Sequence, residues 1–169
     1  MGTNRRDALK GGIALVGAAA GLAAAGTAAK AAENKSLVVY GRGWRITSQD
    51  LERGALPSAG LRMLSRGEIV DKPQRGRKIG NFFATYYRLN PHNKVAADEP
   101  GSLELHTFVF SDGTIVGSGI SSAGSQSEGV FAITGGTGRF LGARGSYVAR
   151  QNHADFGGDG TATFTFTLL

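Results

Sequence analysis

Residues 131–145 read Phe-Ala-Ile-Thr-Gly-Gly-Thr-Gly-Arg-Phe-Leu-Gly-Ala-Arg-Gly, a glycine-rich stretch that follows one apolar run and precedes another. Glycines at this density permit positive φ angles and close backbone approach, which predicts a tight corner between two strands. Phe140 is the large apolar side chain available to anchor that corner. A phosphate-binding loop is the alternative, but no Gly-Lys-Ser/Thr follows and the next segment has the pattern of a strand. The stretch therefore indicates a β-rich fold.

The rest of the chain agrees, because apolar and polar residues alternate along it and no helical period occurs. Residues 161–168 alternate threonine with Ala, Phe and Leu, so one face of this strand is apolar and the other carries hydroxyls. Asp112-Gly113 separates two more alternating runs and predicts a hairpin. The other predicted strands are 37–47, 61–70, 80–89, 103–110, 115–120, 130–134 and 145–152. About eight antiparallel strands suit a small closed barrel, and a sandwich is the alternative from the pattern alone.

Several of these motifs resemble the allene oxide cyclase and dirigent families. The similar segments are Ile133 to Gly138, Ala143-Arg144-Gly145, the hairpin 111–119, and Asp71 with Pro73. The resemblance implies a closed eight-stranded antiparallel β-barrel. Residues 37–44 lack both the glutamate of the plant cyclases and the His-Asp pair of dirigents that guide lignan coupling. The resemblance therefore implies the fold more strongly than either plant reaction.

The first thirty or so residues resemble a bacterial twin-arginine export signal. Arg5-Arg6 precedes an apolar stretch, 11–29, that is rich in Gly and Ala and poorer in large aliphatic residues than a membrane-spanning helix. Small residues around Ala31 suit a signal peptidase. We therefore expect residues 1–31 to be a cleaved signal peptide and 32–169 to be one exported barrel domain without stable membrane insertion. A retained membrane anchor is the alternative.

Composition limits the partners and the chemistry of that domain. The chain has no cysteine, which excludes disulfides, thiolate catalysis and iron–sulfur ligation. Fifteen Lys and Arg against twelve Asp and Glu from residue 32 onward leave a charge of +3, compared with +6 for the whole chain. This charge is too small to indicate nucleic-acid binding. His92, His106 and His153 lack the close spacing of metal ligands, so neither a metal nor another cofactor is predicted.

Acid–base chemistry inside an apolar barrel is favoured instead, with Glu104, Tyr86 and Asp71 as the catalytic candidates. Burial raises the pKa of a carboxyl group toward neutrality, and a tyrosine hydroxyl can polarise a carbonyl. Each residue has a structural alternative: Glu104 on the solvent face of its strand, Tyr86 as a core ring, and Asp71 in a turn. Arg144 is expected to bind an anionic ligand group or to fix the glycine-rich corner. The aromatic residues proposed to line a cavity are Tyr40, Trp44, Phe82, Tyr87, Phe108 and Phe164.

Together these features predict an exported barrel that binds a small, largely apolar molecule. Confinement of a reactive polyene or quinone-like compound in one conformer would make the protein an isomerase, a cyclase or a stereocontrolling protein. The alternatives are a non-catalytic ligand-binding barrel and a cell-envelope interaction protein with a filled barrel. We expect a homo-oligomer, because the alternating apolar positions cannot all point into one narrow barrel. A trimer is the first expectation and a dimer the second.

Overall fold

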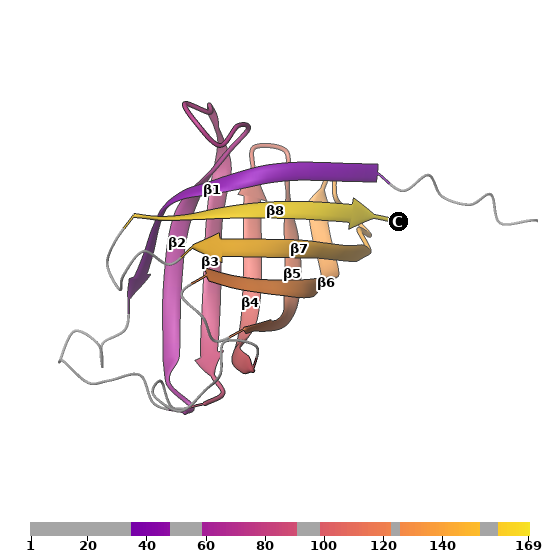
Figure 1. The fold of residues 1–169 in the computed structure, drawn as a ribbon. Coiled ribbons are helices and arrows are strands. Elements are labelled where there is room, and N and C mark those ends of the chain that lie inside the picture. The colour runs from indigo at the N-terminus through magenta and orange to yellow at the C-terminus, as the bar shows by residue number, and fades with distance from the viewer. Residues whose placement is uncertain (1–34, 48–58, 91–98, 123–125, 153–158) are drawn as a thin grey trace, which may run out of the picture. The chain divides into compact units, whose positions relative to one another are not determined.

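The computed structural model describes residues 35–47, 59–90, 99–122, 126–152 and 159–169. In this part of the chain there are eight β-strands and no helix (Figure 1). Their bounds are β1 Lys35–Thr47, β2 Arg62–Val70, β3 Lys78–Arg88, β4 Pro100–Phe110, β5 Gly113–Ser122, β6 Gln126–Gly138, β7 Gly145–Asn152 and β8 Gly160–Leu168.

The strands form one closed antiparallel barrel in sequence order. Each strand hydrogen-bonds to the next, and β8 pairs with β1 to close the sheet, for example Tyr40 with Thr163. This confirms the predicted fold class and excludes the sandwich. Because the sheet closes on itself, it has no free edge strand on which another chain could add a strand.

The glycine-rich stretch differs from its prediction in one respect. Gly135 and Gly136 belong to β6, where they pair with Val116 and Ile115, and the turn itself follows at 139–144. Glycine is required at position 136 of this strand because the chain packs closely there: a Cβ atom on Gly136 would lie 2.4 Å from the carbonyl oxygen of Phe140. Phe140 is buried, as the sequence predicted, and so anchors the corner.

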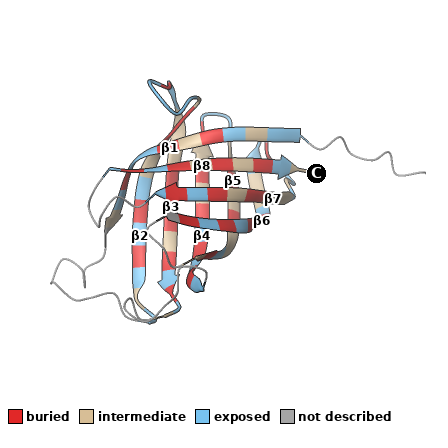
Figure 2. Cartoon of the chain, in the orientation of Figure 1, coloured by how far each residue is buried: buried red, intermediate tan, exposed pale blue. Residues whose placement is uncertain are grey.

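Side chains alternate between the interior and the exterior along each strand, which Figure 2 shows as alternating buried and exposed bands. Aromatic rings dominate the interior and pack in tilted, edge-to-face and stacked pairs, with the centroids of Phe82 and Phe108, for example, 5.1 Å apart. The buried aromatic residues are Trp44, Phe82, Tyr86, Phe108, Phe110, Phe131, Phe140, Tyr147, Phe164 and Phe166. Burial of these rings supplies most of the hydrophobic stabilisation of the barrel.

Two sets of sequence predictions lie outside the described residues. These are the export signal with its cleavage near Ala31, and the histidines His92 and His153. The described part of the chain contains no helix with the length and apolarity that spanning a bilayer requires.

Candidate functional site

The buried polar side chains gather in one half of the barrel. They lie on the halves of the strands that adjoin the β1–β2, β3–β4, β5–β6 and β7–β8 connections, which we call the polar end. Its buried polar and charged residues are Ser65, Arg88, Ser102, Glu104, His106, Ser121, Ser127 and Gln151. The opposite end, around Val70, Phe110 and Phe140, is apolar. A buried polar cluster inside an aromatic barrel makes the polar end the candidate site.

Glu104 is the centre of this cluster. Its side chain is 1% exposed. Oε2 accepts hydrogen bonds from His106 Nε2 at 2.7 Å and from Gln151 Nε2 at 2.9 Å, while Oε1 accepts one from the Ser121 hydroxyl. Three strands, β4, β5 and β7, thus supply the donors for one carboxylate. Such a group is buried at tolerable cost only because these donors replace water.

His106 extends the network to a tyrosine. Its Nδ1 lies 2.9 Å from the Tyr147 hydroxyl. Nε2 donates to the ionised Glu104 carboxylate, and a second hydrogen bond joins Nδ1 to the Tyr147 hydroxyl. The result is a continuous hydrogen-bonded chain from Tyr147 through His106 to Glu104. The ring of Phe131, 4.6 Å away between centroids, packs against the imidazole and holds its orientation.

The pKa of Glu104 moves opposite to the sequence prediction. Burial raises the pKa, but the hydrogen bond and charge of His106 and the hydrogen bonds from Ser121 and Gln151 outweigh burial, and the pKa falls below its ordinary value. Glu104 therefore stays ionised at neutral pH. This suits it to stabilise positive charge and to orient His106, rather than to donate a proton.

Tyr86 supplies a second polar group near this carboxylate. Its hydroxyl hydrogen-bonds to the Ser65 hydroxyl at 3.0 Å, and its ring lies 6.2 Å from that of Trp44. Burial and the nearby charge of Glu104 raise the pKa of Tyr86 well above its ordinary value. Burial likewise raises the pKa of Tyr147. Both hydroxyls therefore remain protonated and can donate to a ligand or a neighbour.

The structure brings only some of the predicted site residues together. Glu104 and Tyr86 lie in the polar end, and Trp44 and Phe108 are buried in the interior. Asp71 lies in the β2–β3 turn at the opposite end, where its Oδ1 accepts a hydrogen bond from the Arg77 backbone at 2.8 Å.

The other predicted ligand-binding residues point away from the interior. Arg144 is exposed at the corner between β6 and β7. Strand alternation places Tyr87 on the outer face of β3, 36% exposed, and half-buried Tyr40 on the outer face of β1. Of the aromatic residues proposed to line a cavity, Trp44, Phe82, Phe108 and Phe164 are buried in the interior, whereas these two tyrosines are not.

Sequence reasoning missed four members of the network: His106, Ser121, Tyr147 and Gln151. One signal was available, because Glu104 and His106 are two residues apart on a predicted strand and so share a face.

Gln151 carries an acceptor without a partner: its Oε1 is buried and has no hydrogen-bond partner among the described residues. It is therefore available to a donor from a ligand.

The fold and the site define a class: closed antiparallel barrels with a buried polar cluster at one end. A family model described as Dirigent-like protein matches residues 68–169. The chain belongs to this dirigent-like family. No curated protein matches the sequence.

Several solved structures share the fold. A pterocarpan synthase dirigent protein aligns with a TM-score of 0.62 and 20% identity, over 82% of this chain and 96% of that one. A pyocyanin demethylase aligns with a TM-score of 0.59 and 16% identity, over 80% and 100% of the two chains. The Diels Alderase AbmU from Streptomyces koyangensis aligns at 0.53 and 14% identity, over 82% and 71%. At these identities the likeness shows a common barrel and not a common reaction.

Proposed function

We propose that the protein is an exported barrel that binds a small, largely apolar molecule at its polar end and directs the isomerisation or cyclisation of that molecule. One observation carries the proposal: the ionised Glu104 carboxylate is fully buried among aromatic rings and held by three donors. A core needs no such group for stability, because apolar side chains of similar volume do as well or better. Its position therefore supports a role toward a ligand.

The residues would act by orientation and electrostatics. The protonated Tyr86 hydroxyl can donate to a carbonyl oxygen of the ligand, and the fixed negative charge of Glu104 can stabilise positive charge that develops in the transition state. The rings of Trp44 and Phe131 would limit the ligand to one conformer, which removes part of the entropic barrier. No atom is gained or lost in such a rearrangement, so no co-reactant is required.

The relatives support this reaction class by analogy. Their names describe a pterocarpan synthase dirigent protein, a Diels Alderase and a heme-binding cyclase that catalyses a [4 + 2] cycloaddition. Two of these names describe a cycloaddition, and the third describes a synthase that is a dirigent protein. The analogy raises the expectation of a cyclase or stereocontrolling role and leaves the substrate to experiment.

The test uses apolar metabolite extracts from the producing organism. Wild type and Glu104→Gln are incubated with the extract, and isomer ratios are compared by chiral chromatography. A compound whose isomer ratio changes with wild type and not with Glu104→Gln supports the proposal. Binding of a compound without any change in isomer ratio supports the non-catalytic alternative. If no compound in the extract binds to wild type and none changes its isomer ratio, the proposal is overturned.

A separate observation favours self-association. The outer face of β2, β3 and β4 carries large apolar side chains around a groove of about 400 Å³, with Leu64, Phe83 and Leu105 exposed by 44%, 47% and 45%. Apolar patches of this kind commonly cover protein–protein contacts. We propose a homo-oligomer, a trimer or next a dimer, that buries this face. The filled aromatic core is also compatible with an interaction protein, which the extract assay distinguishes.

A further inference from the structure

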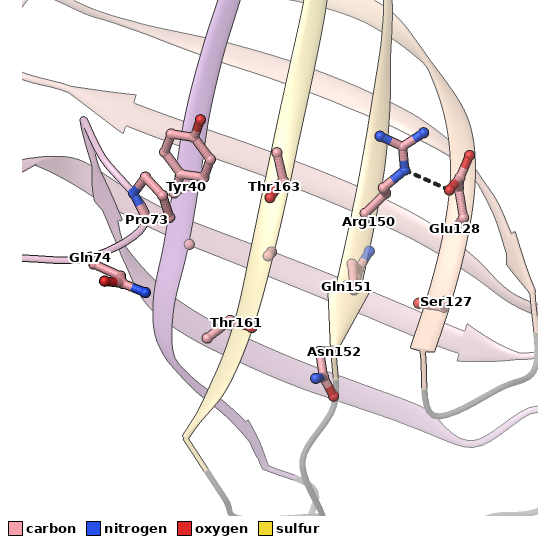
Figure 3. Close-up of a pocket in the computed structure, with 12 residues that line it drawn as sticks. Tyr40, Pro73, Gln74, Ser127, Glu128, Arg150, Gln151, Asn152, Thr161 and Thr163 are labelled. Atoms are coloured by element: carbon pink, nitrogen blue, oxygen red, sulfur yellow. Dashed lines mark hydrogen bonds and ion pairs between the residues drawn. The ribbon is translucent and has the colours of Figure 1, made fainter. Parts of the chain in front are cut away.

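A second hollow lies on the outer face of the barrel, and Gln151 is the member of the Glu104 network among its described lining residues. It has a volume of about 590 Å³ and crosses β1, β8, β7 and β6. One wall is a row of directly paired outward residues, Tyr40, Thr163, Arg150 and Glu128. Figure 3 shows this row, with Pro73 and Gln74 of the β2–β3 turn beside Tyr40. We call this hollow the outer groove.

The floor and the flank of the outer groove are held by hydrogen bonds. Gly41, Ala162, Gln151 and Ser127 pair in one row, and their side chains face the interior, so their backbones form the floor. The turn that carries Pro73 is tied to the sheet, because Asp71 accepts the Arg77 backbone N–H and Arg42 donates to the Gly76 carbonyl at 3.2 Å. A preformed groove loses little entropy when a ligand binds.

The outer groove offers uncharged polar side chains that are available for hydrogen bonds to a ligand. Five uncharged polar side chains line it: Tyr40, Gln74, Asn152, Thr161 and Thr163. None of these side chains hydrogen-bonds to another residue that the structure describes. The two charged side chains among the described lining residues, Arg150 and Glu128, neutralise each other in an ion pair of 2.7 Å. Hydroxyls and amides both donate and accept, while the rings of Tyr40 and Pro73 add apolar surface.

We infer that the outer groove binds a neutral oligosaccharide. Sugars present alternating hydroxyl donors and acceptors together with apolar C–H faces, which is the chemistry of this lining. Among the described residues that line the groove, no cation is left unpaired to bind a phosphate or nucleic acid. A closed barrel offers no edge strand, so an extended peptide cannot bind by strand addition. The volume lies within the range of about 300–1,000 Å³ that is usual for small-molecule sites.

The inference is tested by titrating isotope-labelled protein with cellohexaose, maltohexaose and chitohexaose while amide NMR shifts are recorded. We expect at least one of these sugars to give saturable shifts at the amides of Gly41, Ala162 and Gln151. Tyr40→Ala should weaken that binding by about tenfold, which corresponds to the loss of one good contact. Thr163→Val, which keeps the shape and removes only the hydroxyl, should weaken it several-fold.

Tyr87→Ala is the matched control, because Tyr87 is an outward tyrosine on β3, which contributes nothing to the lining of the outer groove. It should bind the sugar as wild type does. The inference is overturned if none of the three sugars shifts the groove amides at millimolar concentration, or if Tyr40→Ala and Thr163→Val both bind as wild type does. It is also overturned if hexagalacturonate, an anionic sugar, or a Gly-Ser octapeptide binds the groove in place of the neutral sugars.

Discussion

Replacement of Glu104 by glutamine should destabilise the barrel. The carboxylate accepts from His106, Ser121 and Gln151, and the glutamine NH₂ would oppose at least one of these donors. A hydrogen bond to a charged acceptor contributes roughly 1.5–3 kcal/mol, and an unsatisfied buried donor costs about 1–3 kcal/mol. Because these effects overlap, we expect a loss of about 2–4 kcal/mol in the free energy of unfolding at pH 7. For a domain of this size the melting temperature would fall by roughly 10 °C.

The loss should depend on pH in a defined direction. The folded-state pKa of Glu104 lies below its ordinary value of 4.5, so the ionised carboxylate stabilises wild type fully above that value. As the pH falls through the lower folded-state pKa, this stabilisation disappears. The difference between wild type and Glu104→Gln should therefore be constant from pH 7 to about pH 5 and narrow below it.

Urea unfolding at several pH values measures this difference directly. The control is Glu128→Gln, the same substitution at an acid that is 58% exposed and paired with Arg150 on the outer surface. Its effect should stay within about 1 kcal/mol. If Glu104→Gln were as stable as wild type at pH 7, or if its deficit persisted unchanged at pH 3, the reasoning about the buried carboxylate would be refuted.

Three further predictions concern other parts of the chain. Tyr147→Phe should lower the free energy of unfolding by about 1 kcal/mol, because it removes the hydroxyl that hydrogen-bonds to His106 Nδ1; an unchanged urea midpoint would argue against a contribution of this hydrogen bond to the network. Phe83→Lys should dissociate the proposed oligomer, since it places a charge on the exposed apolar face of β3. Sedimentation that shows only monomer for wild type at micromolar concentration would contradict the proposed homo-oligomer. Replacement of Arg5 and Arg6 by lysine should trap the precursor in the cytoplasm, and a normal exported level in cell fractionation would contradict a twin-arginine signal.

Local patterns predicted the barrel well because its strands obey simple rules. Alternation placed residues 161–168 in β8, and Asp112-Gly113 gave the β4–β5 turn. The extent of β6 was missed, because the need for glycine at Gly136 arises from contact with Phe140 and Thr114. Strand pairing creates these contacts, and a linear reading of the sequence does not contain them.

The candidate site was predictable only in part. Alternation put Glu104 and Tyr86 on particular faces of their strands, but which face points inward depends on the closed sheet. The same alternation of side chains places Tyr40 and Tyr87 on the outer face of the barrel. Gln151 reaches Glu104 across 47 residues of chain, and this meeting follows from barrel closure rather than from a motif. The direction of the pKa shift of Glu104 could not be predicted from the sequence either, because it depends on the donors that barrel closure brings to the carboxylate.

Trp44 allows the most direct test of ligand binding at the polar end. It is the only tryptophan of the chain, and it is buried beside Tyr86 and stacked on Phe82 with centroids 4.6 Å apart. Its fluorescence should be quenched by menadione, a small quinone, in a saturable manner at one molecule per chain, and more weakly in Tyr86→Phe. Quenching that stays linear and equals that of free N-acetyltryptophanamide, with menadione and with a polyene such as retinol, would contradict a ligand site inside the barrel.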